Sequence, residues 1–501
     1  MSNTTIRIEG GLLATPAPRG NGVRCFKGIP YAAAPVGELR WRAPHRVADW
    51  PGVRSAGAFG PNSIQGVVFA DIDPTVPGVS EDCLYLNVWT TAPDAAAAMP
   101  VMVWIHGGGF AVGSGAEPRY DGGNLAARGV VVVTLNHRLN ALGFLAHPEL
   151  SSESASGASG NYGLMDIVAA LGWVSRNIRA FGGDPARVTI AGESAGSMAV
   201  SALMAAPSAK GLFAGAIGES GALFPSCGRT IQSLAAAQEA GVQFARRLGA
   251  ASLAALRRIP ANDILAAAPG TGFGPIIDGD VLRAPLPRIF AAGAQNDVPL
   301  LAGWNRDEGF NFNAYDIFKK REDEASLADI VRRVFGAQSP EALAFYPADT
   351  KQSEAQSARR LGADAVIVQG TWAWLEAQKK TGASDIFRFQ FDRAPLTPEG
   401  WFGSRRSADA GAFHAGELLY VFDNLDAFPW LVDEDDVKIA KLTSSYWLNF
   451  IKTYDPNGEG LPHWPSYREE EGRLLAIDAQ PSVRSDEDRA RQRFLAARLG
   501  T

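Results

Sequence analysis

Cysteine is scarce in this sequence, and so are long apolar runs. Only three of the 501 residues are cysteines, Cys25, Cys83 and Cys227, and this odd, sparse count argues against a disulfide framework. The longest apolar runs, such as residues 130–135, are far shorter than the ~20 residues that a membrane-spanning helix needs. We therefore expect a protein of the reducing cytoplasm with no helix in a membrane.

Clusters of basic residues are also missing. The chain has 47 Lys and Arg against 53 Asp and Glu, a formal net charge of -6, and no basic block. Proteins that bind the phosphate backbone of nucleic acids usually present such a block. Nucleic acid is therefore not an expected partner. Residues 1–11 lack the apolar core and small-residue cleavage site of a secretory signal, which agrees with the cytoplasmic expectation.

Short β-branched runs alternate with longer amphipathic segments, which predicts an α/β fold: a mostly parallel central sheet flanked by helices. Two helices have readable ends, one from Asp166 to about Gly182 and one from residues 433–436 to about Asp455. No internal repeat and no polar linker divides the chain, so we expect one domain over residues 1–501 with large loop and helical insertions. The predicted strands are residues 86–90, 101–106, 130–136, 188–191, 214–219, 299–305 and 386–391.

A G-x-S-x-G motif follows the predicted strand 188–191, at Gly192, Glu193, Ser194, Ala195 and Gly196. The motif alone is a weak signal, but here a strand precedes it and a helix of small and apolar residues follows. In this context the flanking glycines permit a tight turn that projects the serine at the carboxyl edge of the sheet. Ser194 is therefore the candidate nucleophile.

A second glycine-rich segment follows the predicted strand 101–106, where His106 precedes three consecutive glycines. Glycines let backbone N–H groups converge on a developing oxyanion without side chains in the way. We expect the N–H groups of Gly108, Gly109 and Ala195 to form an oxyanion hole. A phosphate-binding loop is the alternative, but no Lys-Ser or Lys-Thr pair follows these glycines.

Several sequence blocks together resemble the type-B carboxylesterases, the cholinesterase-like branch of the α/β-hydrolases. Residues 181–196 are similar to the serine signature of that family, and residues 81–88 are similar to its second signature. Residues 26–32 and 160–166 also match its usual blocks, in the right order. The resemblance implies an α/β-hydrolase fold and a serine hydrolase that needs no cofactor.

The order of catalytic residues in that family is Ser, Glu, His, and this order implies where the partners of Ser194 lie. Residues 303–309 resemble the acid block and place Glu308 at the acid position, although the residues alone do not separate it from Asp307. Residues 411–418 resemble the histidine block and make His414 the base. Ser220 matches a position that supports the triad by hydrogen bonding in the family, and we group Glu193 with it as a supporting residue.

These residues predict a carboxylic-ester hydrolase that works through an acyl-enzyme intermediate on a small-molecule ester. An amide or thioester hydrolase on the same triad is an alternative, as is an adhesion-type binding protein, which the intact Ser194 and His414 disfavour. We expect no metal site, because no two histidines flank a glutamate at helical spacing and the cysteines are not paired in sequence. The sequence makes no prediction of an oligomeric state.

Two departures from the family pattern carry their own expectations. Secreted members pair the cysteine at the position of Cys83 with one near Asn62 or Ser63, which is absent here, so we predict that Cys83 is a free, buried thiol. The choline-binding tryptophan has no counterpart in residues 64–82, where Phe69 is the single aromatic, so choline esters are not expected substrates. Residues 61–80 are predicted to form a long surface loop. Three aromatics near the motifs are either cavity walls or core: Phe110, Phe273 and Trp304.

Overall fold

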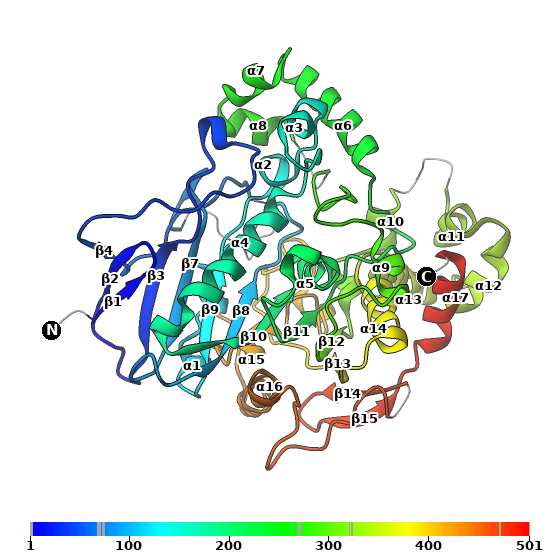
Figure 1. Ribbon diagram of the computed structural model, residues 1–501. Helices are drawn as coiled ribbons and strands as arrows, with labels where there is room; N and C mark the ends of the chain where they lie inside the picture. The colour runs from blue at the N-terminus through cyan, green and yellow to red at the C-terminus, as the bar shows by residue number, and fades with distance from the viewer. Residues whose placement is uncertain are drawn as a thin grey trace.

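A large twisted sheet runs through the computed structural model, which describes residues 4–67, 72, 76–268, 272–319, 321, 324–469 and 472–499 (Figure 1). Its ten strands within these residues are, in order across the sheet, β15 (Ser482–Ser485), β14 (Arg473–Ile477), β13 (Ile386–Phe391), β12 (Leu300–Asn305), β11 (Gly215–Glu219), β10 (Gly183–Glu193), β8 (Met99–Ile105), β9 (Val131–Leu135), β7 (Tyr85–Thr90) and β3 (Arg24–Pro30).

Neighbouring strands are parallel from β9 to β14, and the pairs at the two edges are antiparallel. The prediction of a mostly parallel central sheet is therefore confirmed. A three-stranded sheet of β1 (Thr4–Ile8), β2 (Gly11–Thr15) and β4 (Val53–Ser55) lies at the N-terminal end, and β5 (Asn62–Ser63) pairs with β6 (Val79–Ser80).

Helices pack on both faces of the sheet. Those of the described residues are α1 (Gly123–Ala126), α2 (Asn140–Phe144), α3 (Pro148–Glu153), α4 (Tyr162–Asn177), α5 (Ala195–Ala205), α6 (Leu234–Arg247), α7 (Leu253–Arg257), α8 (Ala261–Ala267), α9 (Leu286–Ala291), α10 (Ala314–Ile317), α11 (Leu327–Phe335), α12 (Ser339–Phe345), α13 (Lys351–Ala363), α14 (Gln369–Thr381), α15 (Leu418–Val421), α16 (Glu434–Thr453) and α17 (Arg489–Leu499).

The strand β8 shows why the sheet needs cover on both sides. Alternate side chains of a strand point to opposite faces. Val103 belongs to the core cluster that includes side chains of α4, α5 and α14, whereas Trp104 belongs to the cluster formed with α15 and α16. Figure 1 shows α4 and α5 on one side of the sheet and α16 on the other. Both faces are thus dry, as expected for parallel strands.

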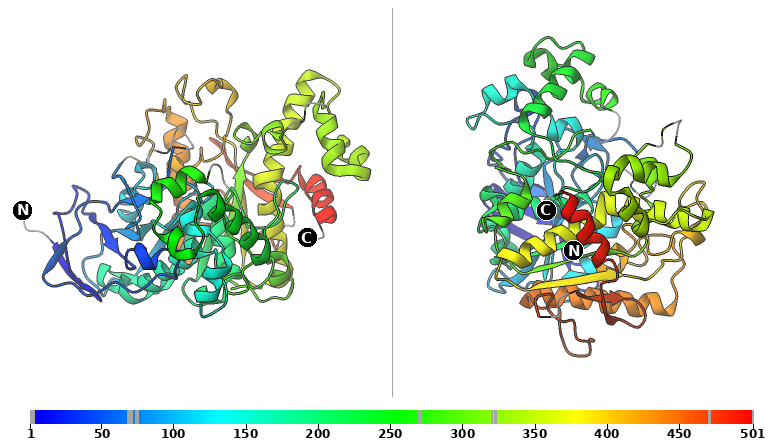
Figure 2. Two further views of the ribbon diagram at one scale, coloured as in Figure 1. Left: turned by 90° about the horizontal axis from the view of Figure 1, so that it is seen from above. Right: turned by 90° about the vertical axis from the view of Figure 1, so that its right-hand side faces the viewer.

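Two helical groups extend the molecule beyond the sheet. Helices α6, α7 and α8 pack with α2 above the sheet in the view of Figure 1. Helices α11 to α13 share a separate core with α17, and Figure 2 shows α17 against these green-yellow helices in the view from the right. A π-helical turn, Asp364–Val368, joins α13 to α14. These groups are the helical insertions that the sequence analysis expects.

Some boundaries differ from the sequence-based expectations. The helix expected from Asp166 begins at Tyr162, because the small and apolar residues before Asp166 continue the helical face. Residues 151–153, expected in a loop, complete α3 after Pro148 at its first position. The predicted loop 61–80 contains the short strands β5 and β6 within its described part.

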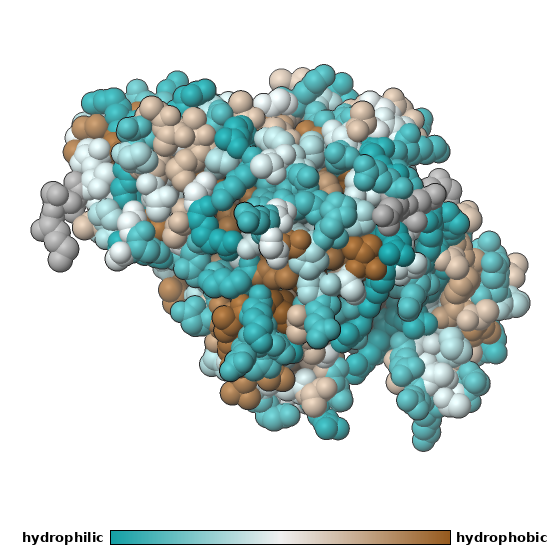
Figure 3. Space-filling model, turned by 90° about the horizontal axis from the view of Figure 1, so that it is seen from below, coloured by the Kyte–Doolittle hydropathy of each residue, from teal (hydrophilic) through white to brown (hydrophobic). Residues whose placement is uncertain are grey.

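In the described part of the chain, every helix is too short or too polar to cross a bilayer. Hydrophilic residues cover most of the face seen from below, and apolar residues are exposed there in small groups (Figure 3).

Candidate active site

Ser194 occupies a strained turn between β10 and α5. Its φ of 55° and ψ of -121° lie in a region that side chains rarely adopt. A Cβ on Gly196 would lie 2.0 Å from the carbonyl oxygen of Ile105, so only glycine allows α5 to approach β8 this closely. The turn therefore forms because the glycine pattern permits it, and it presents the Ser194 hydroxyl at the carboxyl edge of the sheet.

The imidazole of His414 lies between Ser194 and Glu308. Its Nε2 is 2.9 Å from Ser194 Oγ, and its Nδ1 is 2.6 Å from Glu308 Oε2. Ser194 follows β10, Glu308 follows β12, and His414 lies in the long segment after β13. Because these strands are parallel, their carboxyl ends meet at one edge of the sheet, which brings together residues 220 positions apart.

The structure separates Glu308 from its neighbour Asp307. Glu308 is fully buried, and its Oε1 accepts a hydrogen bond of 2.9 Å from the backbone N–H of Asn305, which holds Oε2 toward His414. Asp307 instead accepts from the backbone N–H of Ala412 at 2.8 Å and pairs with Arg306 at the surface. The aspartate thus holds the backbone of the histidine segment, and the glutamate faces the imidazole.

Glu193 brings a second carboxyl group to the imidazole. Its Oε1 lies 3.1 Å from Nε2 of His414 but is not aligned for a hydrogen bond, because Nε2 is directed to Ser194. Burial lowers the pKa of His414, but the carboxylates of Glu193 and Glu308 outweigh this effect and raise it above the ordinary value. Burial also raises the pKa of Glu193. The charge on Glu193 therefore adds to that of Glu308 in raising the basicity of His414.

Two further buried carboxyl groups lie beside the site and were not found from the sequence. Glu417 accepts a hydrogen bond from the side chain of Asn305, and Glu219 accepts one of 2.8 Å from the indole N–H of Trp447. Burial raises the pKa of both glutamates. Their places in the sequence could have identified them. Glu219 directly precedes Ser220, and Glu417 follows His414 by three residues.

The glycine-rich loop packs directly against the nucleophile. A Cβ on Gly107 would lie 3.2 Å from Cβ of Ser194, and one on Gly108, whose φ is +102°, would lie 2.2 Å from the carbonyl oxygen of Val112. No described residue accepts a hydrogen bond from the N–H groups of Gly108 and Gly109. Ala195 is the first residue of α5, so its N–H has no partner inside the helix. Gly108 and Gly109 line the cavity over Ser194, and Ala195 directly follows that serine.

His106 has a structural environment. Its ring stacks on His137 with a centroid distance of 4.7 Å and an interplanar angle of 7°. Burial lowers the pKa of His106 to about 3 and that of His137 to about 4. Both rings are therefore neutral at physiological pH, and they stack in parallel next to the glycine loop.

Ser220 differs from the expectation. The resemblance implies a hydrogen bond from its side chain to the catalytic group, but its buried Oγ has no partner among the described residues. Its backbone is anchored instead, because its N–H donates to the carbonyl of Gly303 at 2.8 Å and its φ is 55°.

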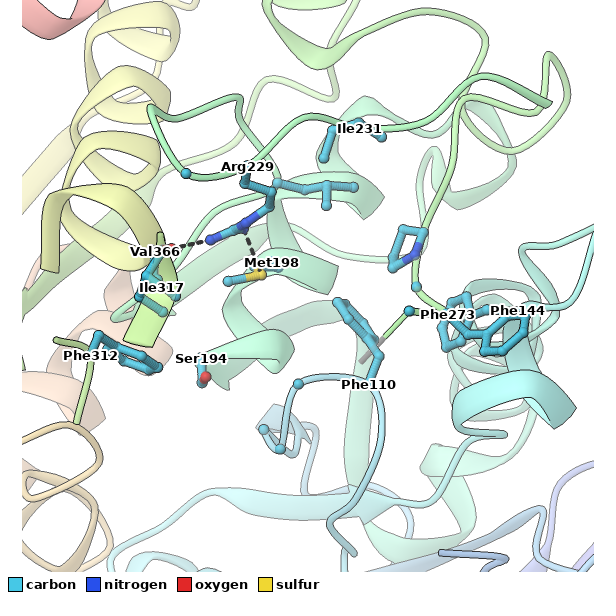
Figure 4. Close-up of a pocket in the computed structure, with 18 of the residues that line it drawn as sticks. Phe110, Phe144, Ser194, Met198, Arg229, Ile231, Phe273, Phe312, Ile317 and Val366 are labelled. Atoms are coloured by element: carbon cyan, nitrogen blue, oxygen red, sulfur yellow. Dashed lines mark hydrogen bonds between the residues drawn. The ribbon is translucent and has the colours of Figure 1, made fainter. Parts of the chain in front are cut away.

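A cavity of about 670 Å³ opens over Ser194, within the size range of small-molecule sites. Phe110 and Phe273 line it, whereas Trp304 is 2% exposed and lies in the core. Figure 4 shows Phe110 on one side of Ser194 and Phe312 on the other. Phe69, the single aromatic of residues 64–82, lies outside the described residues. The cavity is thus mostly apolar, and the hydroxyl of Ser194 lies at its base.

Cys83 is free and buried, as predicted. Its Sγ lies 3.5 Å from Ser63 Oγ, and burial raises the pKa of the thiol to about 12. A thiol with this pKa is protonated and unreactive at neutral pH. Among the residues that the structure describes, no three His, Cys, Asp or Glu side chains are grouped to hold a metal ion.

A parallel sheet with a serine turn at its carboxyl edge and an imidazole poised over the hydroxyl is the arrangement of an α/β-hydrolase. The model of the carboxylesterase family matches residues 4–495. The chain is 37% identical to a fumonisin B1 esterase of Sphingopyxis macrogoltabida, over 91% of this chain and 84% of that protein. It is 37% identical to the para-nitrobenzyl esterase of Bacillus subtilis, over 95% and 96%.

Solved structures give the same result. A structure titled PNB esterase superimposes with a TM-score of 0.83 and 33% identity, covering 99% of each chain. The chain belongs to the type-B carboxylesterase family, as the sequence blocks predicted, and it is a carboxylesterase.

Proposed function

We propose that this enzyme cleaves small carboxylic esters through an acyl-enzyme on Ser194, with His414 as the base and Glu308 as the acid that orients it. The observation that carries the proposal is the line of hydrogen bonds from Ser194 Oγ through the imidazole to the Glu308 carboxylate. His414 accepts the hydroxyl proton as Ser194 attacks the ester carbonyl. Glu308 holds the ring in the correct tautomer and stabilises the imidazolium that forms.

The developing oxyanion is assigned to the N–H groups of Gly108, Gly109 and Ala195. Support comes from Gly108 and Gly109, which line the cavity, and from Ala195, which begins α5 directly after Ser194. In other enzymes each such donor stabilises a tetrahedral intermediate by about 2.7–4 kcal/mol. His414 then gives its proton to the leaving alcohol. A water molecule, activated by the same imidazole, hydrolyses the acyl-enzyme and restores Ser194.

The whole chain is assigned to one catalytic domain of the cytoplasm. The family model spans residues 4–495 without a break, and the buried thiol of Cys83 has no disulfide partner among the described residues, which supports a reducing compartment. Hydrolysis of amides or thioesters would use the same three side chains. The rates of hydrolysis of a panel of esters, amides and thioesters would show which class the enzyme prefers.

Substitution of the nucleophile tests the proposal. S194A is expected to lower kcat for a short-chain 4-nitrophenyl ester by roughly 10⁶-fold while the thermal transition stays nearly unchanged. A fluorophosphonate probe should label the wild type and leave S194A unlabelled. S201A is the matched control, because Ser201 does not line the cavity: its hydroxyl donates to the carbonyl of Met198 and accepts from the N–H of Leu223. An S194A variant that retained turnover would disprove the mechanism.

A further inference from the structure

The cavity over Ser194 has a positive charge balance, although the chain as a whole carries a formal charge of -6. The carboxyl of Glu193 is matched by the imidazole of His414, whose Nε2 lies 3.1 Å away, and Arg119 is paired with Glu117 at 3.0 Å. Arg229 and Arg405 therefore dominate the charge of the cavity lining. The acidic and basic side chains that line the cavity among the described residues are Arg119, Glu193, Arg229, Arg405 and His414.

Arg229 reaches the wall of the cavity close to the nucleophile. Its Nη1 lies 3.0 Å from the sulfur of Met198, and the backbone N–H of Met198 donates to the carbonyl of Ser194 at 2.9 Å, one helical turn away. Figure 4 shows the guanidinium directly above Met198, with Ser194 beneath them. The cation is thus placed one helical turn of α5 from the group that attacks the ester.

The position of Arg229 is held by the π-helical turn Asp364–Val368. A π-turn is wider than an α-turn and is frequent at functional sites. The carbonyl of Ala365 accepts from the hydroxyl of Ser226, and the carbonyl of Val366 accepts from Nη2 of Arg229. Residues 226 and 229 also hydrogen-bond to each other through their backbones. Both the backbone and the side chain of Arg229 are therefore fixed before a substrate arrives.

The charge of Arg229 has no counter-ion among the described residues. Its guanidinium contacts are the sulfur of Met198 and the carbonyls of Ala222 and Val366, and these use three of its five N–H groups. Burial lowers the pKa of Arg229 to about 10, so the group remains charged at neutral pH. Holding a desolvated cation without an anion is costly, which indicates that an anionic ligand completes the site.

We propose that Arg229 binds a carboxylate carried by the substrate, so that the preferred substrates are esters with a second, ionised acid group. This inference rests on the proposed function of Ser194. A guanidinium matches the two oxygens of a carboxylate with two parallel N–H donors, and Arg229 has two N–H groups to offer. The remaining apolar walls, such as Phe110 and Ile231, suit the chain that joins the ester to the acid.

Two pairs of esters test the proposal in the wild-type enzyme. The first compares 4-nitrophenyl hydrogen adipate with 4-nitrophenyl hexanoate, which places the carboxylate on the acyl side. The second compares 6-acetoxyhexanoate with hexyl acetate in a pH-stat, which places it on the alcohol side. We expect kcat/KM to be roughly 10- to 100-fold higher for the charged member of at least one pair. Equal or lower values for the charged member in both pairs would overturn the proposal.

Variants assign the preference to one side chain. R229M removes the charge but keeps an apolar stem, and the ratio of kcat/KM for the charged and neutral esters should fall to about 1. R229K should retain part of the ratio. R405M is the matched control, because Arg405 lines the same cavity but is exposed and stacks over Phe310 at 4.6 Å. A ratio that R405M reduces as much as R229M does would refute the assignment to Arg229.

The outcomes also separate this inference from the proposed function. If wild type hydrolysed the neutral esters without any preference for the charged ones, only the carboxylate site would fail. If it hydrolysed neither, or if S194A remained active, the mechanism itself would fail. Should R229M not fold, the wild-type ratios and R229K still decide the matter, as does competitive inhibition by adipate measured against uncharged hexanamide. Adipate that inhibited no better than hexanamide would argue against the site.

Discussion

Oε1 of Glu193 lies 3.1 Å from Nε2 of His414, the nitrogen whose other neighbour is the hydroxyl of Ser194. The imidazole therefore has a carboxyl group on each of its two nitrogens, with Glu308 on Nδ1. Glu308 is aligned with the ring and holds it, whereas Glu193 acts on the ring through charge. This difference gives the two acids distinct experimental signatures.

Replacement of Glu193 by glutamine should change the pH dependence of the reaction. The Glu193 carboxylate raises the pKa of His414, and a protonated imidazole does not act as a base, so removal of this charge lets His414 stay neutral to lower pH. The acid limb of the kcat/KM profile should move to lower pH by roughly one unit or more. The measurement is a pH–rate profile with a neutral ester. A limb that stayed in place or moved to higher pH would contradict the assignment.

Replacement of Glu308 should instead lower the rate at every pH. E308Q removes the carboxylate that holds Nδ1, so kcat should fall by roughly 10³- to 10⁴-fold. The matched control is D307N, since Asp307 lies one residue away and contacts the backbone of Ala412. That variant should retain kcat within a few-fold in a steady-state assay. Comparable losses in both variants would mean that the acid had been misassigned.

A methyl group at Gly196 should disrupt the serine turn. In G196A the Cβ meets the carbonyl of Ile105 at 2.0 Å, and neither backbone can rotate away, so unfolding free energy should fall by about 3 kcal/mol or more. G172A is the comparison, because Gly172 lies within α4 and a Cβ there meets only the end of Arg176 at 3.3 Å. G172A should stabilise by roughly 0.5–1 kcal/mol. Denaturant unfolding measures both, and equal effects would contradict the steric argument.

The buried ion pair of Arg138 and Asp166 should matter for stability more than any surface pair does. Nη2 and Oδ1 are 2.7 Å apart, and the side chains are 3% and 0% exposed. D166N leaves the guanidinium buried without its counter-ion and should cost about 3–5 kcal/mol in thermal or urea unfolding. K438A breaks an exposed pair with Asp435 and should cost less than about 1 kcal/mol. A loss in D166N no larger than in K438A would refute this account.

Much of the site could be read from the sequence because its parts are local. The turn at Ser194 depends on the glycines within two residues of it, and β13 has the bounds, Ile386–Phe391, that the sequence predicted. Helix α16 begins after Asp433, whose side chain caps it as the acidic run suggested. Such features depend on neighbours in the chain, and local chemistry therefore identifies them.

Other features depend on residues that are distant in the chain. Asp307 and Glu308 are adjacent and chemically alike, and their roles differ only because β12 directs one to the imidazole and the other to the surface. Arg229 gave no signal, since its neighbours in the sequence form no motif. It became notable when the turn at Asp364–Val368 placed it beside Met198 without a counter-ion.

The sequence alone therefore determined seven strands of the central sheet, the serine turn, the glycine loop and the family to which they belong, because each is a short-range pattern of size, charge and backbone freedom. The tertiary structure alone decided which acid faces His414, how Glu193 changes the basicity of that ring, and which charges line the cavity. These depend on burial and on distances between remote segments, and electrostatic energies change steeply with both.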